Sequence, residues 1–262
     1  MLLAQLSDPH VVVPGALLLG GIDTTAFLRA AVAHVAALDP EPDLVLITGD
    51  LVNDGQLEQY HHLRDLLAPL SAPVHLLPGN HDHVPTLRGA FPQEVPGRGG
   101  RADGVLEGEL CVVCLDSSRF PAAGGDLDPD QLTWLDGVLG GASTPTVVAV
   151  HHPPFATGIR HMDGMALSQE ASAALATVIE RHPHVERVLC GHLHRTITRR
   201  FAGTIAMTAP STAHAVHLDL ADGPPAWTDE PPGVLLHHWD PDKGLVTHLS
   251  LIGDHPPVPF QM

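Results

Sequence analysis

Six short apolar runs, separated by longer stretches with a helical period, constrain the fold of this chain more than any other feature. They span residues 2–6, 44–48, 74–77, 110–115, 147–150 and 188–190. Each run has the length of a β-strand, and near-continuous apolarity is typical of strands that are covered on both faces. Amphipathic stretches between the runs predict helices at about residues 24–38, 56–68, 129–139 and 169–181. Strands that alternate with helices in this way indicate an α/β layered fold.

The chain changes character after Thr204. Short apolar runs alternate with Gly and Pro there, without a helical period, at residues 204–208, 216–220, 234–239 and 245–252. We interpret these runs as antiparallel strands that make a second sheet against the first, and Pro-rich residues 223–233 as a surface loop. A chain of 262 residues can bury one substantial core. We therefore predict a single domain over residues 1–262, in which residues 204–262 complete the second sheet and the substrate edge.

The charge balance excludes some classes of partner. Thirteen Lys and Arg residues against 30 Asp and Glu residues give a formal net charge of −17. A field of this sign repels DNA and RNA, so we expect no nucleic-acid polymer as a partner. No apolar run reaches the roughly 18 residues that span a bilayer, and the N-terminus lacks the basic segment of a secretory signal. We expect a cytoplasmic protein without a membrane partner, and homo-oligomerisation stays open.

Three cysteines are too few for the disulfide framework of a secreted protein. Cys111 and Cys114 stand within one apolar run, where side chains three residues apart point to opposite faces of a strand. We interpret these two residues and Cys190 as buried structural thiols, and not as a redox pair or half of a zinc site.

Five polar clusters follow five of the apolar runs. They are Asp8-Pro9-His10, Gly49-Asp50, Gly79-Asn80-His81-Asp82, His151-His152-Pro153-Pro154 and Gly191-His192-Leu193-His194. In an open α/β sheet, the residues just past the strand ends gather along one edge, where ligands bind. The five clusters are therefore expected to converge in space.

The donors in these clusters suit metal ions. Asp8 and His10 are two apart on an extended segment, so both side chains project to one side, and His192 and His194 repeat this spacing. Carboxylate, imidazole and amide donors bind divalent Mn, Fe, Co or Zn, and the absence of cysteine argues against a closed structural zinc site. One such cluster is weak evidence, but five at strand ends predict a dinuclear centre. Bound cations would also let a chain of charge −17 attract a phosphate ester.

In this order, the five clusters resemble the motif series of the calcineurin-like metallophosphoesterase superfamily: Asp-x-His, Gly-Asp, Gly-Asn-His-Asp/Glu, His and Gly-His-x-His. The match covers residues 1–194. The chain looks most like the branch of class III cyclic nucleotide phosphodiesterases and glycerophosphodiester phosphodiesterases. The supporting segments are Ser7-Asp8-Pro9-His10, Gly49-Asp50-Leu51-Val52-Asn53, Leu115-Asp116-Ser117-Ser118 and His151-His152-Pro153-Pro154. The resemblance implies a four-layer αββα sandwich of two mixed sheets.

The resemblance also implies a ligand set for two divalent ions. The two sets are Asp8, His10, Asp50 and His194 for one ion, and Asp50, Asn80, His151 and His192 for the other. Asp50 would bridge the ions. Because the family's ligand is the first histidine of its motif, His151 is preferred over His152, which would support the ligands from behind.

An activity follows from this resemblance and from charge. A hydroxide shared by the two ions would attack the phosphorus of a small phosphate diester, at a site of net charge about +1. The favoured substrate class is a 3′,5′-cyclic nucleotide, and the alternatives are a glycerophosphodiester phosphodiesterase or a phosphodiesterase of broad specificity. A metal-dependent scaffold without turnover and a protein phosphatase are less favoured, given the complete ligand set and the lack of an evident peptide-binding extension.

Three residues are candidates for contact with the substrate. His81 follows a ligand directly without being one in the family, and we expect it to protonate the leaving alkoxide or stabilise its charge. Asn53 and His214 are predicted to contact the phosphate or an ester arm. Residues 155–167 are placed to form a lip over the site.

Other features remain open or receive a structural interpretation. Aromatic residues are scarce, and Phe155, Phe201 and Trp227 are the candidates to stack against a base. The pairs His61-His62 and His237-His238 match no motif, and we interpret them as structural or solvated.

Overall fold

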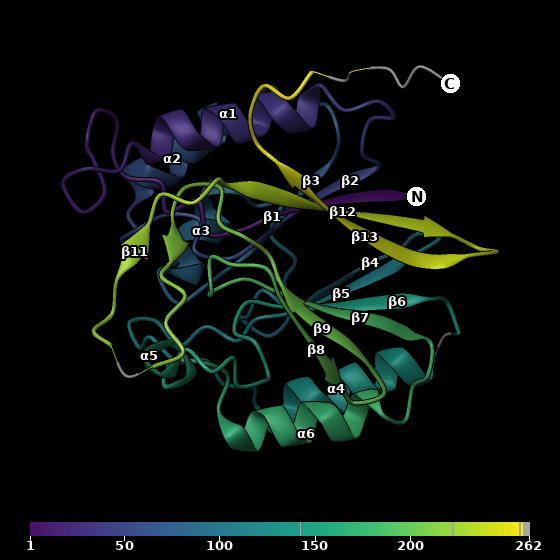
Figure 1. Ribbon diagram of the computed structural model, residues 1–262. Coiled ribbons are helices and arrows are strands. Elements are labelled where there is room, and N and C mark those ends of the chain that lie inside the picture. The colour runs from purple at the N-terminus through teal and green to yellow at the C-terminus, as the bar shows by residue number, and fades with distance from the viewer. Residues whose placement is uncertain (142, 222, 257, 259–262) are drawn as a thin grey trace.

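The computed structural model describes residues 1–141, 143–221, 223–256 and 258. These residues form four layers, in which two β-sheets stack face to face and helices cover their outer faces (Figure 1). The expected α/β sandwich is therefore confirmed. None of the helices in the described ranges has the length and apolarity that crossing a bilayer requires.

The first sheet has the strand order β13-β12-β1-β2-β3. Its parallel strands are β1 (Leu2–Leu6), β2 (Leu44–Thr48) and β3 (Val74–Leu77). β12 (Gly233–Asp240) pairs antiparallel with β1, and β13 (Gly244–Leu251) pairs antiparallel with β12. β1 therefore lies at the centre of its sheet, between β2, which is the next strand in the chain, and β12, which comes more than 220 residues later.

The second sheet has the strand order β4-β5-β6-β7-β9-β8. Its four inner strands run parallel: β5 (Cys111–Leu115), β6 (Thr146–Val150), β7 (Val185–Cys190) and β9 (Thr204–Thr208). The edge strands β4 (Gly104–Leu106) and β8 (Ile197–Phe201) are antiparallel to their neighbours. A separate two-stranded ribbon joins β10 (Ala215–Val216) to β11 (Trp227–Thr228).

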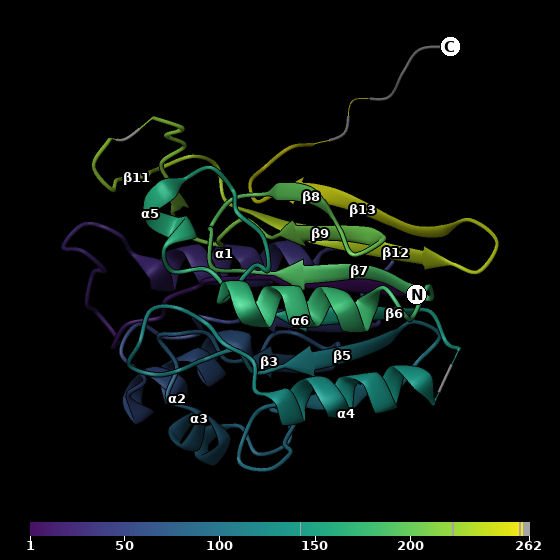
Figure 2. The ribbon, with the colours of Figure 1, turned by 90° about the horizontal axis from the view of Figure 1, so that it is seen from below.

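Helices close the outer faces of both sheets. The first sheet is covered by α1 (Thr24–Ala36), α2 (Leu57–Leu67) and α3 (Val84–Ala90). The second is covered by α4 (Pro129–Gly140) and α6 (Gln169–Ile179), which lie across it in Figure 2. Two predicted helix starts are confirmed, because Asp128 is the N-cap of α4 and the Ser168 hydroxyl accepts from the Ala171 amide at the start of α6. The short α5 (Arg160–Asp163) lies apart from both helical layers, near the β10–β11 ribbon.

Apolar side chains alternate between layers along the buried strands. On β2, Leu46 faces the second sheet while Ile47 faces the helices. Cys111 and Cys114 likewise fall on opposite faces of β5, the first toward the helical layer and the second between the sheets. All three cysteines are free thiols, Cys114 and Cys190 fully buried and Cys111 only partly. Because both faces of each sheet are covered, the strands can be apolar at nearly every position.

The region after residue 204 differs in part from the expectation. It supplies strands, but they complete both sheets: β9 joins the second sheet in parallel with β7, whereas β12 and β13 extend the first. The run at 216–220 contributes only the end of β10, and β11 interrupts the predicted loop at 223–233. Local apolar pattern identifies a strand, but the edge it pairs with depends on contacts far away in the chain.

Candidate metal centre

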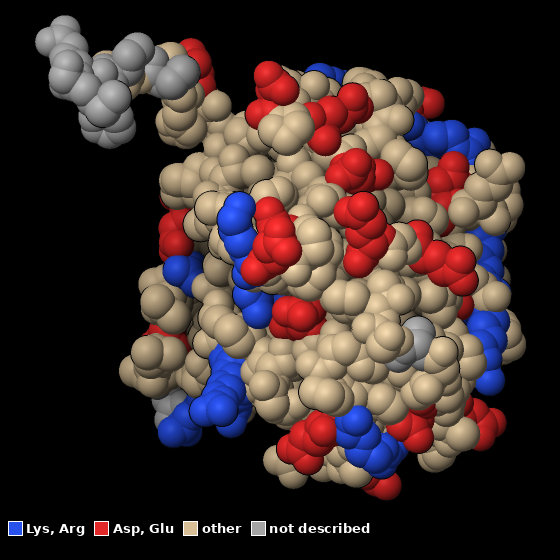
Figure 3. All heavy atoms as spheres, turned by 90° about the vertical axis from the view of Figure 1, so that its right-hand side faces the viewer, with Lys and Arg blue, Asp and Glu red and all other residues tan. Residues whose placement is uncertain are grey.

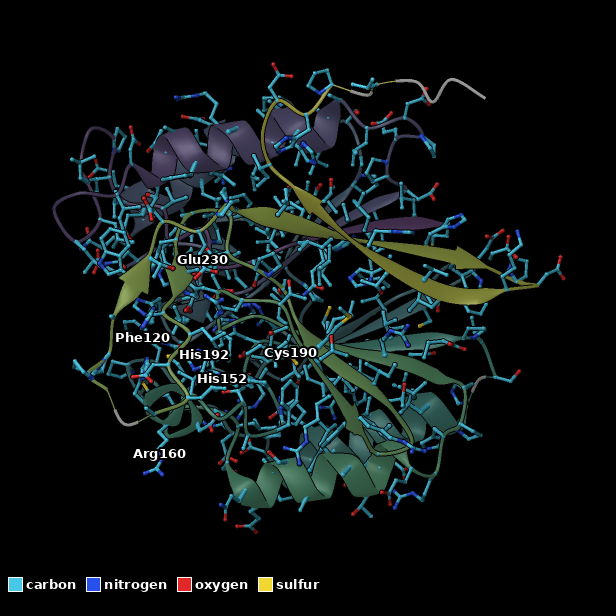
Figure 4. The ribbon with its side chains drawn as sticks, viewed as in Figure 1. Phe120, His152, Arg160, Cys190, His192 and Glu230 are labelled. Carbon is cyan, nitrogen blue, oxygen red and sulfur yellow. The ribbon has the colours of Figure 1, made fainter. Side chains whose placement is uncertain are left out.

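The five polar clusters do converge, at the carboxyl ends of the parallel strands. β1, β2 and β3 of the first sheet and β6 and β7 of the second each deliver one cluster to this edge. Figure 4 shows His192 and His152 beside each other there, with His192 just beyond Cys190 at the end of β7. The site thus lies across the junction of the two sheets.

One group of donors contains Asp8, His10, Asp50 and His194, whose ligand atoms all lie within 4.8 Å of one another. The Nε2 atoms of His10 and His194 are 3.1 Å apart. His10 Nε2 is also 3.5 Å from an Asp50 carboxylate oxygen, and His194 Nε2 is 3.5 Å from an Asp8 oxygen. All four residues are buried.

A second group forms on the other side of Asp50. His151 Nε2 lies 3.5 Å from the same Asp50 oxygen that faces His10, and 3.3 Å from the Asn80 amide oxygen. His192 Nδ1 lies 3.1 Å from that amide oxygen. One carboxylate oxygen of Asp50 therefore stands between the two groups.

His151 and His152 are both buried, but they face different partners. His151 donates through Nδ1 to the Thr48 carbonyl at 2.7 Å, which leaves Nε2 directed at Asp50. Both ring nitrogens of His152 have partners behind the site, the Ser117 hydroxyl at 2.8 Å and the Ala123 carbonyl at 3.2 Å. His152 also joins His151 and His192 in a cluster within 4.8 Å. This geometry favours His151 as the donor toward Asp50, with His152 packed behind it.

The backbone at the donors is strained. Five of them adopt a left-handed conformation, with φ between 44° and 69°: Asp8, His10, Asp50, His192 and His194. Such a conformation costs about 1 kcal/mol or more in a non-glycine residue and is concentrated at functional sites. The glycines beside them allow close approach, because a Cβ at Gly79 would collide with the Asp50 carboxylate and one at Gly191 with the Ser7 hydroxyl. The fold therefore holds these side chains in place at a local energetic cost.

Burial sets the protonation states of the donors. Removal from water lowers the pKa of His10 and of His192 to about 3, so both rings are neutral and can offer a lone pair. Burial also raises the pKa of Asp8 to about 7, with the Asp50 carboxylate adding to the effect. Burial alone would raise the pKa of Asp50, but His151 and His10 hold it well below its usual value. Two adjacent carboxylates in this setting need positive charge close by.

Acidic side chains do not gather into one patch on the face of the molecule that is opposite the site. On the face opposite the strand carboxyl ends, Asp and Glu side chains are scattered and Lys and Arg form small groups (Figure 3). Exposed charges are largely screened beyond about one Debye length, so groups within the site determine its local field.

These residues fit two divalent ions. Imidazoles, carboxylates and one amide oxygen converge in two sets, and this is the donor chemistry of borderline first-row metals. The ring nitrogens that face the two donor groups are Nε2 of His10 and Nδ1 of His192. The paired buried carboxylates of Asp8 and Asp50 are unfavourable alone, and cations beside them would remove the conflict.

The predicted substrate contacts all line one pocket over the donors. This pocket has a volume of about 270 Å³, and its wall includes Asn53, His81 and His214. The predicted lip at 155–167 supplies Met162 of α5 and Met165, two residues past the end of that helix, to the wall of the same pocket. Of the candidate stacking residues, only Trp227 lies beside the site, 6.2 Å from the His214 ring, whereas Phe155 and Phe201 pack toward the helices.

The histidine pairs outside the motifs lie away from this pocket. His62 Nε2 lies 2.9 Å from the Thr25 hydroxyl, between α2 and α1. His237 on β12 is fully buried, with its Nε2 3.0 Å from Gln5 Oε1. The structural interpretation of these two residues is confirmed.

Two buried residues that shape the site were not assigned a role from the sequence. Gln5 donates to the Thr48 hydroxyl on β2 and to the Cys190 carbonyl on β7, both at 3.0 Å, and so joins the two sheets below the donors. Asp82 accepts from the amides of Leu51 and Gly79 and from the Tyr60 hydroxyl. A Gln inside an apolar strand was the available signal for the first residue, since buried polar groups need partners.

Asp82→Ala is expected to destabilise the protein by about 3 kcal/mol or more, because several buried donors lose their acceptor together. The turn that carries Asn80 and His81 should loosen, so metal affinity should fall as well. Chemical denaturation of the metal-free protein measures the first effect. Asp65→Ala, an exposed carboxylate on α2, is the control. A stability equal to wild type would show that Asp82 is not an anchor of the site.

Comparison with known proteins agrees with this geometry. The model of the calcineurin-like phosphoesterase family matches residues 1–196. A probable glycerophosphodiester phosphodiesterase GpdQ of Arcobacter nitrofigilis is 34% identical, over 99% of this chain and 97% of its own length. The 3′,5′-cyclic adenosine monophosphate phosphodiesterase CpdA of Pseudomonas aeruginosa is 32% identical, over 97% and 91%.

A solved structure supports the fold independently. A dimetal phosphatase from Danio rerio superposes with a TM-score of 0.64 at 16% identity, over 97% of this chain and 99% of its own. The family match and the two donor groups together support a dinuclear divalent metal site. The chain belongs to the calcineurin-like phosphoesterase family.

Proposed function

We propose that this protein is a dinuclear metal-dependent phosphodiesterase that hydrolyses a small phosphate diester, with a 3′,5′-cyclic nucleotide as the favoured substrate class. The observation that carries the proposal is the position of Asp50, whose one carboxylate oxygen lies 3.5 Å from both His10 Nε2 and His151 Nε2. An oxygen placed this way can bridge two ions, as dinuclear hydrolysis requires.

The proposed ligand assignment follows the two donor groups. Asp8, His10, Asp50 and His194 would hold one ion, and Asp50, Asn80, His151 and His192 the other, with Mn, Fe, Zn or Co as the candidate metals. Such ions, when bound, supply Lewis acidity and an activated water at neutral pH. Thr48 and the His214 carbonyl orient His151 and His194 by accepting from their Nδ1 atoms, at 2.7 and 3.1 Å.

His81 is placed to act as the proton donor. Its Nδ1 donates to the Asn53 carbonyl at 2.7 Å, and its amide donates to Asp50 at 3.0 Å. The ring packs edge-on to His10 with centroids 4.7 Å apart and lines the pocket. Because Nδ1 is held by a carbonyl acceptor, Nε2 is the atom that would give a proton to the leaving oxygen of the diester.

Asn53 and His214 both line the pocket and would bind the substrate there. The Asn53 side chain donates to Asp54 at 2.9 Å, so its amide oxygen remains the acceptor toward the pocket. Burial lowers the pKa of His214 to about 4, so this imidazole is neutral and can accept or donate one hydrogen bond without adding charge.

The two substrate classes rest on different support. The relatives named for glycerophosphodiesters and for cyclic adenosine monophosphate are about equally similar. Trp227, partly exposed beside His214, favours a cyclic nucleotide because an indole ring can stack on a base. A glycerophosphodiester or a broad range of diesters is the alternative, and we place the activity in the cytoplasm.

Diesters are expected to show a larger kcat/KM than monoesters. A monoester dianion should bind a site of charge about +1 at least as tightly, but binding made equally in the ground state does not accelerate the reaction. Methyl p-nitrophenyl phosphate and p-nitrophenyl phosphate should be compared on one metal-loaded preparation, with inorganic phosphate as a competing inhibitor. A clear preference for the monoester would overturn the phosphodiesterase proposal and leave the metal centre standing.

A further inference from the structure

Leu19 combines two unfavourable features at one position. It is 67% exposed, although it is a large apolar side chain. It also adopts a left-handed backbone conformation with φ of 51°, which a leucine rarely occupies. Only seven non-glycine residues in the described ranges have positive φ; five are the metal-site donors and another, Ala202, lies in the turn between β8 and β9.

The strained position of Leu19 is built into a tight loop. Leu18 and Ile22 exchange two backbone hydrogen bonds of 2.9 Å, so that Leu19 and two glycines form the tip. Leu18 and Ile22 pack with Val12 and Ala213 in a small apolar cluster of their own. The base of the loop is therefore fixed. Leu19 at the tip is part of the wall of the pocket over the metal site.

Residues from α5 and β10 add further apolar surface to that pocket. A second small cluster packs Met162 of α5 against Leu193 and Val216. The loop that carries α5 is pinned, because Asp163 accepts from the Thr157 amide at 2.7 Å and the Gly158 amide at 3.0 Å. The apolar residues that line the pocket are Leu18, Leu19, Ala123, Met162, Met165 and Val216.

We propose that Leu19 contacts the substrate. Together with the apolar side chains of Met162 and Val216, it selects diesters that carry an apolar or planar arm over diesters with a hydroxylated arm. This inference rests on the proposed function, because it takes the arm to belong to a diester held at the metal site. A polyol arm would lose water against these walls without regaining hydrogen bonds. An alkyl chain or a nucleobase gains from the same contact.

The test measures binding of n-alkylphosphonates to the Mn-loaded protein by calorimetry, since their P–C bond is not hydrolysed. From methyl- to butylphosphonate the Kd should fall about eightfold, or about twofold per methylene, because the open wall gives roughly half the effect of full burial. A 2,3-dihydroxypropyl phosphonate should bind no better than the methyl compound. A Kd that does not change with chain length, or tighter binding of the dihydroxypropyl compound, would overturn the inference.

The variant Leu19→Asn separates this role from a structural one. Asparagine tolerates the left-handed conformation, so Tm of the metal-free protein should rise by about 2 °C while the dependence of Kd on chain length flattens. Leu19→Gly should behave in the same way, which guards against an effect of the amide. The control is Leu17→Asn. Leu17 is a half-exposed neighbour outside the pocket wall and has no positive φ, so this variant should show the same dependence of Kd on chain length as wild type. An unchanged series in both Leu19 variants would refute the contact.

The two proposals fail separately. If methyl p-nitrophenyl phosphate is not hydrolysed but the phosphonate series keeps its dependence on chain length, the apolar contact stands and the phosphodiesterase activity does not. If the diester is hydrolysed and the series is flat, only the role of Leu19 is lost.

Discussion

Asp50→Ala is expected to abolish turnover, with a loss of more than about 10³-fold in kcat, which exceeds the effect of removing a single electrostatic stabiliser. The reason is that one carboxylate oxygen of Asp50 faces a histidine of each donor group. Its removal withdraws a ligand from both ions together. Metal content per chain, measured by elemental analysis after dialysis, should fall toward zero for both sites.

His10→Ala is the matched variant, because His10 belongs to one donor group only. It should lower the content by about one ion per chain and leave the second ion bound. Two ions per chain in the Asp50 variant would contradict a bridging carboxylate.

His81→Ala is expected to lower kcat by about 10² to 10⁴, the usual contribution of a positioned proton donor. Metal content should stay close to wild type, because neither ring nitrogen of His81 is within the donor groups. The loss should depend on the leaving group. A p-nitrophenolate leaves without protonation, so bis(p-nitrophenyl) phosphate should suffer less than a dialkyl ester.

The control for His81 is His61→Ala, an exposed histidine on α2 that should change neither rate nor metal content. Equal losses on the aryl and the alkyl diester would exclude His81 as a general acid and leave it an electrostatic role.

The sequence predicted the parallel strands that end at the five polar clusters, and the convergence of those clusters, because both depend on local pattern. Each apolar run is long enough to be one strand, and each donor sits directly after a run, so that the order of the chain already places Asp8 and Asp50 at the same edge. Glycines such as Gly79 mark the close approach that the structure shows.

What the sequence did not predict depends on contacts between distant segments. The pairing of β12 with β1 joins residues 230 to 236 positions apart, and no local period encodes it. Leu19 precedes two glycines that would be expected to take any left-handed turn, so nothing in the pattern assigns that conformation to the leucine. Gln5 acquires its role only when β2 and β7 have come together around it.

The central position of β1 has a consequence for how the protein is made. β1 is synthesised before the other described strands, yet one of its two edges is completed only by β12, the twelfth of the thirteen described. Asp8 and His10 follow β1 directly. The donor group to which they belong therefore depends on a strand that has a partner on only one edge until β12 is made. During that interval the exposed edge offers unpaired amides and carbonyls to other chains. The hairpin of β12 and β13 supplies none of the proposed ligands, but we expect a nascent chain to bind metal stably only after this hairpin has paired with β1.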